Sequence, residues 1–310
     1  LNSNTPDNLQ DTNIFTSGVN ITQLISARQY FTLVPSFSRY YYETLLTDNR
    51  QYSLAASWQY QLFRLTNVGL SLSARNIDYI EQTISDTRFT NMAIVIKGKR
   101  RRSTFSLNLG STDVERDNGQ ETTGFSGFMD WETELSSRSE FKASISSELT
   151  DASSVSALAG DVPGSEDIQI TADVIRTSVM KMSYSRDDDS LTSRVWARYN
   201  KVTYSDDPLD RIIRSFGMQA NYPISGLLSS GIYLDYNRTK QIDTDRLDER
   251  YSIGGNLKYN FSRKLHGLFD LKYRKKESSL ESENYDDVSA FVSLVYGFGD
   301  IYRPTRAGGM

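Results

Sequence analysis

Apolar and polar residues alternate along most of the chain, in stretches of roughly ten residues or more, which is the length of a tilted strand that crosses a bilayer. Near the C-terminus, for example, Ile253, Leu257 and Tyr259 alternate with Asn256 and Lys258. Because successive side chains of a strand point to opposite faces, each such stretch has one apolar and one polar face. The pattern predicts an all-β protein of antiparallel up-and-down strands.

Short turns and longer loops alternate between these stretches. Residues 186–191 (RDDDSL) form a short turn in this scheme, and the longest connection, residues 150–166, is long enough to fold inward. We therefore expect one barrel domain over residues 1–310, with a polar lead-in at 1–11 and a C-terminal tail at 300–310.

The pattern gives about fifteen strands, whereas barrels of single bacterial chains normally have an even number. The first strand, near 12–24, begins on the long-loop side, so we expect that an N-terminal strand is missing and that the complete barrel has about sixteen. Residues 167–186 are the other source of an extra strand, because Arg176 and Ser178 interrupt their apolar face. One strand, with a bulge, keeps the later loops in phase, and two strands do not. Closure is then expected where the last strand, 287–299, meets a strand that the chain does not fully contain, or closes imperfectly on 12–24.

The composition fits a β-barrel. The chain has 19 Tyr and 14 Phe but one His, 6 Pro and no Cys, which is a mixture rich in aromatic residues. The mean hydropathy of −0.50 is compatible with membrane strands, because half of each strand is polar. Without Cys there is no disulfide framework, and the net charge of −4 gives no reason to expect a nucleic-acid partner.

Two soluble architectures also produce alternating strands. A β-sandwich usually has strands of about five or six residues, which is shorter than the stretches seen here. A β-solenoid requires a fixed short repeat, and the sequence contains none. The length of the alternation therefore favours a barrel with lipid outside and water inside.

Aromatic residues lie near the ends of the predicted strands. Ordinary β-propensity is one explanation, and aromatic girdles at the two membrane interfaces are the other, which we favour for outward-facing rings. The expected interface aromatics are Trp58, Tyr60, Trp131, Tyr222, Tyr236, Tyr259, Phe261, Tyr273, Tyr296 and Phe298.

The polar faces carry charges of both signs. These charges either pair across strands and solvate the wall or form a selectivity lining. They include an acidic cluster at 130–134 and a basic cluster at 97–102. The expected pore-lining residues are Arg75, Lys97, Lys99, Asp130, Glu132, Glu134, Lys142, Glu148, Arg194, Trp196, Arg198, Tyr233, Asp235, Lys258, Asp270, Lys272 and Arg274.

Catalysis has little support in the sequence. The one histidine, His266, lies beside a short turn, and no Cys/His cluster offers a metal site. The acidic loops lack the ligand spacing of a calcium site. We therefore expect no enzyme activity, no catalytic residue, no cofactor and no metal.

Several segments carry a resemblance to a known family. They are the start PDNLQDTNIFTSGVNITQLISARQYF, the strand endings LDYNRT and LKYRKK, the phrase MSYSRDDDSLTSRVWARYN and the close VSLVYGFG. With these features the chain resembles, over nearly its whole length, the β-barrel porin families associated with exopolysaccharide export clusters. Such barrels often end at a terminal aromatic residue, whereas here Phe298 is followed by GDIYRPTRAGGM.

The resemblance implies a conduit for an exported polysaccharide in the outer membrane of a Gram-negative bacterium. The implied partners are outer-membrane lipid, the polysaccharide cargo, and a periplasmic export protein or a partner that fills the lumen. The alternatives are a general small-solute porin, a scaffold or sheath around a partner protein, and an adhesin that acts through its loops.

Overall fold

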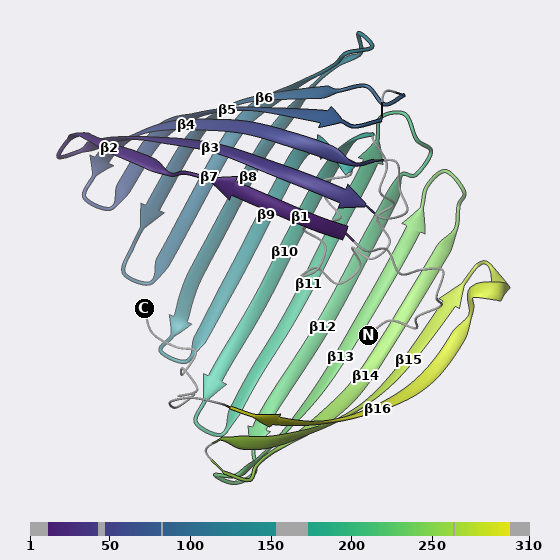
Figure 1. Ribbon diagram of the computed structural model, residues 1–310. Helices are drawn as coiled ribbons and strands as arrows, with labels where there is room; N and C mark the ends of the chain where they lie inside the picture. The colour runs from purple at the N-terminus through teal and green to yellow at the C-terminus, as the bar shows by residue number, and fades with distance from the viewer. Residues whose placement is uncertain (1–11, 43–46, 82, 153–172, 263, 298–310) are drawn as a thin grey trace. The chain divides into compact units, whose positions relative to one another are not determined.

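The computed structural model describes residues 12–42, 47–81, 83–152, 173–262 and 264–297. In this part of the chain the strands form one sheet of 16 strands (Figure 1). The strands are β1 (Thr12–Gly18), β2 (Ile21–Ser26), β3 (Gln29–Tyr42), β4 (Asn49–Phe63), β5 (Thr66–Tyr79), β6 (Thr87–Lys99), β7 (Ser103–Arg116), β8 (Glu121–Ser136), β9 (Ser139–Asp151), β10 (Val174–Asp188), β11 (Leu191–Tyr204), β12 (Arg211–Pro223), β13 (Leu228–Gln241), β14 (Leu247–Asn260), β15 (Leu265–Ser278) and β16 (Tyr285–Tyr296). A 3-10 turn, η4 (Glu281–Glu283), precedes β16.

From β3 onward each strand pairs with the next one along the chain, which is the predicted up-and-down order. The short connections lie on one side, as between β10 and β11, and the longer ones on the other, as between β11 and β12. Antiparallel strands can be joined by such tight turns because their ends are adjacent. The all-β, up-and-down fold class is thus confirmed. The predicted junction between the last and first strands stays a prediction.

The first predicted strand is divided into β1 and β2, which pair with β3 in one register as far as Leu24, beyond which the register shifts. The division lies opposite Pro35. The amide of Val19 donates to the carbonyl oxygen of Pro35 at 3.1 Å, but proline has no N–H to return the bond. A missing donor therefore separates the two segments, and this division accounts for the sixteenth strand.

β10 is a single strand over Val174–Asp188, so the chain does not turn at Arg176 or Ser178. The expectation of one strand is confirmed for this part, and the alternative of two strands is wrong. Residues 167–172 lie outside the described residues, as do most of the 150–166 connection, the lead-in at 1–11 and the tail at 300–310.

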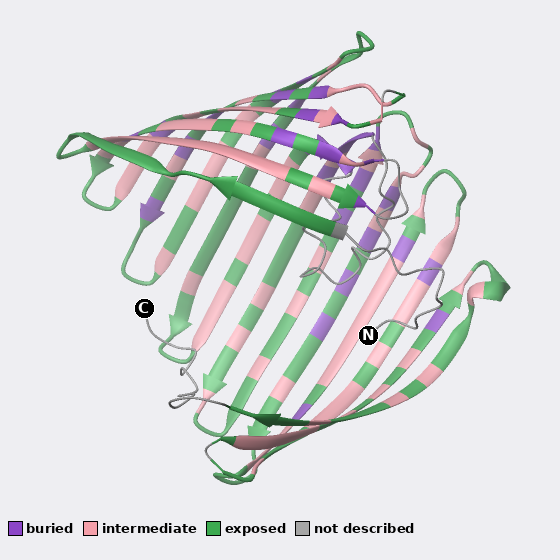
Figure 2. Cartoon of the chain, in the orientation of Figure 1, coloured by how far each residue is buried: buried purple, intermediate pink, exposed green. Residues whose placement is uncertain are grey.

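Burial in the sheet is the reverse of that in a soluble protein. On β4, Leu54 is 48% exposed and Trp58 is 37% exposed, whereas Gln51 and Gln59 are 6% and 8% exposed. Figure 2 shows this alternation of exposed and less exposed residues along the strands. Apolar side chains remain on an outer face only where lipid replaces water as their solvent.

The residues group into two compact units. Unit 1 comprises 1–133, 142–180 and 200–212, and unit 2 comprises 134–141, 181–199 and 213–310. The expected single domain over the whole chain stays a prediction. Among the described residues, no helix has the length and apolar character needed to span a membrane.

Cysteine labelling tests which face meets lipid, since the natural chain has no cysteine. We expect Asn256→Cys in a reconstituted barrel to react with a membrane-impermeant maleimide, because its side chain faces water. Leu257→Cys, one residue along the same strand, should not react until detergent dissolves the bilayer. Mass spectrometry measures both reactions, and the opposite result would exclude the membrane orientation described above.

Candidate functional site

The polar face of unit 1 is built from hydroxyl and amide side chains of neighbouring strands. The Asn91 side chain on β6 donates to Thr112 Oγ1 at 2.8 Å and to Ser126 Oγ at 2.6 Å. Thr112 and Ser126 are only 4% and 6% exposed. Buried polar groups are stable when they are hydrogen-bonded. This row of small polar residues on neighbouring strands therefore forms a wall without apolar packing at these positions.

A cavity of about 380 Å³ opens on this face. That volume lies in the range of pockets that hold small ligands, about 300–1,000 Å³. Two of its lining residues, Arg75 and Glu148, are charged, and most of the others are small or polar. The lining is Ser53, Leu54, Ala55, Ser73, Ala74, Arg75, Phe89, Asn91, Asn108, Thr112, Ser126, Gly127, Phe128, Ser146, Ser147, Glu148 and Leu149.

Arg75 is held in place at this cavity by two contacts. Its guanidinium carbon lies 4.6 Å from the centre of the Phe89 ring, a cation–π arrangement. One of its terminal nitrogens donates to Thr150 Oγ1 at 3.0 Å. The guanidinium therefore cannot swing freely, and it presents a fixed positive group to whatever enters the cavity.

Thr150, which accepts the hydrogen bond from Arg75, belongs to a feature that we call the loop base. The loop base comprises residues 149–152 and 173–175, at the two ends of the β9–β10 connection. Tyr79 Oη on β5 donates to Asp151 Oδ2 at 2.7 Å, and Asp151 is fully buried. β5 and β9 are four positions apart in the sheet. The bond therefore joins the side chains of two strands that are not neighbours, across the polar face.

The other end of the loop base is anchored on β7. The Asp173 carboxylate accepts a hydrogen bond from Arg116 at 2.9 Å and from the backbone amides of Asp206 and Asp207 at 3.0 and 3.1 Å. Arg116 also pairs with Asp206 at 2.5 Å. The amide of Ala152 donates to the carbonyl of Asp173 at 2.9 Å, which ties the two ends together.

The loop base shares an apolar cluster with β5, β6 and β7. The cluster consists of Ile77, Tyr79, Phe89, Val114, Leu149 and Val174, all buried. The alternation along β9 assigns Leu149 to the apolar, outward face together with Ile145, but this assignment is wrong, because Leu149 packs against the inner cluster. Ile77 and Tyr79 were not predicted to lie at this site. Their signal was present, since they continue the polar-face positions of Ser73 and Arg75 but are apolar.

The polar face of unit 2 brings together six of the expected pore-lining residues. The registers of β13 with β14 and of β14 with β15 place them on the face opposite Ile253 and Leu257. Tyr233 Oη lies 3.1 Å from Asp270 Oδ1, to which it donates. Gly254 allows this contact, because a Cβ there would lie 2.4 Å from the tyrosine ring. The six residues are Tyr233, Asp235, Lys258, Asp270, Lys272 and Arg274.

Gly217 makes similar room for Trp196, whose ring would lie 2.4 Å from a Cβ at that position. Other expected lining residues form ion pairs, namely Lys142 with Glu132 at 3.4 Å and Arg274 with Asp287 at 2.6 Å. The polar face therefore carries both charges that form ion pairs and charges that are expected to line the pore. Lys97, Lys99, Asp130, Glu134, Glu148 and Arg194 are exposed, and Arg198 is half-buried.

The expected interface aromatics are exposed or half-buried. Tyr259 and Phe261 contact each other with ring centres 4.8 Å apart, and Trp58 stacks on Tyr60 at 6.4 Å. Trp131, Tyr222, Tyr273 and Tyr296 are 37–50% exposed, and Tyr236 is half-buried. Phe298 lies outside the described residues.

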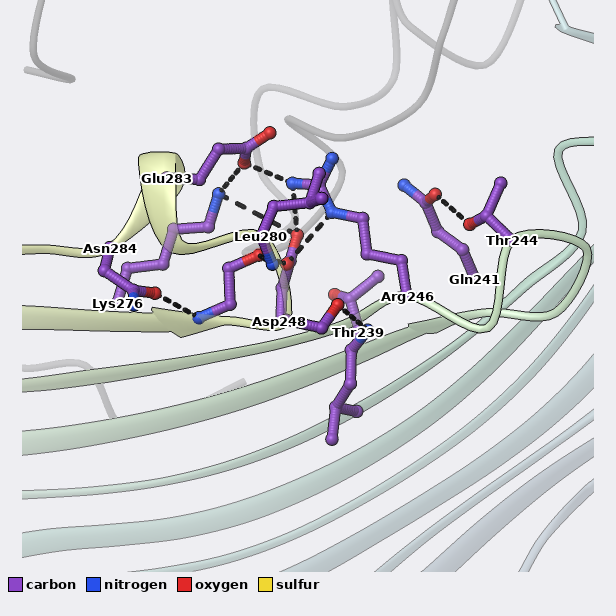
Figure 3. A network of polar contacts seen from close by, with 12 residues as sticks. Thr239, Gln241, Thr244, Arg246, Asp248, Lys276, Leu280, Glu283 and Asn284 are labelled. Atoms are coloured by element: carbon purple, nitrogen blue, oxygen red, sulfur yellow. Dashed lines mark hydrogen bonds and ion pairs between the residues drawn. The ribbon is translucent and has the colours of Figure 1, made fainter.

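A polar network fixes the loop before β16 (Figure 3). Glu283 accepts from Lys276 Nζ at 2.5 Å and from Arg246, and Arg246 also pairs with Asp248 at 2.9 Å. Hydrogen bonding from Lys276 is the largest cause that lowers the pKa of Glu283 below its ordinary value of 4.5. Burial opposes the shift and Arg246 adds to it.

An up-and-down antiparallel sheet with an exposed apolar face and a buried polar face defines a class of protein, the outer-membrane β-barrels. The chain has the fold of this class. No family model matches the chain, and no curated protein matches its sequence.

Solved structures support the same class. The chain is similar to the copper transporter OprC, with a TM-score of 0.56 and 11% identity over 91% of this chain and 56% of that one. It thus spans about half the length of OprC. Two weaker likenesses are the siderophore receptor PirA from Pseudomonas aeruginosa (TM-score 0.46, 12% identity, 93% and 63% covered) and an anion-selective porin from Comamonas acidovorans (0.40, 10%, 93% and 100%). At 11% identity the likeness to OprC shows the fold alone. The reversed burial of the sheet agrees with the expected outer-membrane location.

The Tyr79–Asp151 bond makes the loop base testable. We expect Tyr79→Phe to lower the free energy of local opening at residues 150–152 by about 1–3 kcal/mol, because a buried carboxylate loses a donor. Hydrogen exchange measured by mass spectrometry reports this opening. Tyr236→Phe, which removes the bond to Glu249 in unit 2, should leave these amides unchanged. Equal protection in the wild type and Tyr79→Phe would show that the bond does not hold the loop base.

The loop before β16 should loosen in acid. Folding lowers the pKa of the Glu283 carboxyl, so its ionised form stabilises the folded loop. This stabilisation is complete above the pKa of the unfolded chain, and it is lost as the pH falls through the lower pKa of the folded loop. We therefore expect hydrogen exchange at 279–284, corrected for intrinsic rate, to accelerate once the pH falls below 4.5, the ordinary pKa of Glu283. Glu283→Gln should exchange fast at every pH, while Glu281→Gln in the same turn should keep the wild-type profile. A profile of Glu283→Gln that still depends on pH would assign the effect to another group.

Proposed function

We propose that the protein is an outer-membrane channel in which the polar face lines a hydrated conduit, and that its cargo is an exported polysaccharide. Transport is passive. The wall offers many weak hydrogen bonds that a passing molecule exchanges one after another, so the molecule is never bound too tightly to dissociate.

The observation that carries the channel proposal is the reversed burial of the sheet. Gln51, Thr112 and Ser126 are buried and polar, while Leu54 on the other face is 48% exposed. A wall of this kind is stable only if lipid lies outside and water or a polar molecule lies inside.

Two features support a sugar polymer as cargo. The cavity of unit 1 is lined by serine hydroxyls, asparagine amides and the Phe128 ring, which are groups that pair with sugar hydroxyls and cover the apolar face of a sugar ring. The sequence also resembles barrels associated with exopolysaccharide export.

Planar bilayers test the channel itself. We expect the purified barrel to produce discrete steps of ionic current, because the conduit is hydrated. Detergent without protein is the control. A barrel that acts as a scaffold around a missing partner would pass no current on its own, and this result would overturn the channel proposal.

Deletion of the gene tests the cargo. We expect the deletion strain to lose surface polysaccharide, measured by sugar analysis of the cell exterior, and a plasmid copy to restore it. Unchanged polysaccharide together with slower uptake of small solutes would replace the export proposal with that of a general porin.

A further inference from the structure

The charges in β1–β7 of unit 1 are distributed unevenly between the two ends of the strands. Among the described residues between 12 and 116, every Asp and Glu lies in a long-side connection or within the last few residues of a strand on that side. Those within strands are Asp78, Asp113 and Glu115. Arginine occurs at both ends. The short-turn end of these strands therefore has cations and no carboxylates.

Three short turns concentrate these cations in what we call the basic rim: Arg28, Arg64 and Arg100–Arg102, all exposed. The turns are adjacent. The amide of Gln61 donates to the carbonyl of Arg28 at 2.8 Å, and the amide of Lys99 donates to that of Leu65 at 2.8 Å. Five guanidinium groups thus lie along the short-turn end of these strands.

The positive charge continues from the basic rim along the polar face. Lys97 and Lys99 on β6 share the face of Asn91, because they are separated by even numbers of residues. Their partners on β7 are neutral, since Lys97 lies opposite Ser106 and Lys99 lies opposite Thr104.

Farther along this face lies Arg75, at the cavity. Carboxylates bound the positive region. Glu148 and Asp151 lie at its long-loop end, and Asp130 and Glu132 on β8 lie beside it. Within these bounds, an entering anion meets guanidinium and ammonium groups, hydroxyls and amides.

We propose that this face of unit 1 takes anions, and that the polysaccharide is an acidic one that carries carboxylate or phosphate groups, captured at the basic rim. The inference rests on the proposed function and names its substrate class. Guanidinium groups bind carboxylates and phosphates in bidentate geometry, which suits capture of successive acidic sugars. A cluster of one sign also raises the association rate of an opposite charge by about 10- to 1,000-fold, an effect that salt screens.

The test is made on single channels of the full chain in planar bilayers. A potassium chloride gradient gives the reversal potential, and tetragalacturonate or neutral maltotetraose, added from the short-turn side, gives a rate of block. We expect anion selectivity and faster block by tetragalacturonate, weakened by salt. In Arg100→Gln/Arg101→Gln/Arg102→Gln, the rate of block by tetragalacturonate should fall about tenfold, while that by maltotetraose should not change.

Two control variants separate charge from structure. Replacement of the same three residues by lysine should restore the rate of block. Arg138→Gln, in an exposed short turn of unit 2, should leave it unchanged.

Each contrary result has a distinct meaning. Current without a preference for anions or for tetragalacturonate overturns this inference and leaves the channel in place. A barrel that passes no current overturns the proposed function and this inference with it. If the glutamine variant loses only its binding to phosphatidylglycerol vesicles, the basic rim holds lipid headgroups and the inference is wrong.

Discussion

Backbone hydrogen bonding between consecutive antiparallel strands is the constraint on which the rest of the structure depends. In a bilayer no water satisfies exposed amides and carbonyls, so each strand must find its partners in the neighbouring strands. Pro35, opposite Val19, has no N–H to donate. The hydrogen-bond ladder is interrupted there, but the register continues beyond it. The sheet tolerates that loss because the residues on both sides stay paired.

With the backbone satisfied by the ladder, the side chains are free to divide between two solvents. One face carries leucine, isoleucine and aromatic rings, and the other carries serine, asparagine and charged groups. Glycines allow large side chains to lie flat on the polar face, as Gly217 does for Trp196 and Gly254 for Tyr233. The wall is therefore both polar and closely packed, which suits weak and repeated contacts with a polar molecule.

The loop base changes the character of this wall in unit 1. It places a buried aspartate, Asp151, against Tyr79 and shares an apolar cluster with β5, β6 and β7. Arg75 lies between the cavity and the loop base, and it donates to Thr150. The cavity, the Arg75 guanidinium and the loop base form one connected arrangement. The short-turn end of β1–β7, which has no carboxylates among the described residues, lies at the other end of the same strands.

The sequence by itself determined the strands, their two faces and the alternation of short and long connections, because these follow from a period of two residues and from turns that are local in the chain. The rhythm of the connections also favoured one strand at β10 over two, and the structure confirmed it. Only the tertiary structure decided that Asp151 meets Tyr79, 72 residues away, and that Leu149 turns inward. Such contacts depend on where strands four positions apart come to lie, which no local pattern of alternation records.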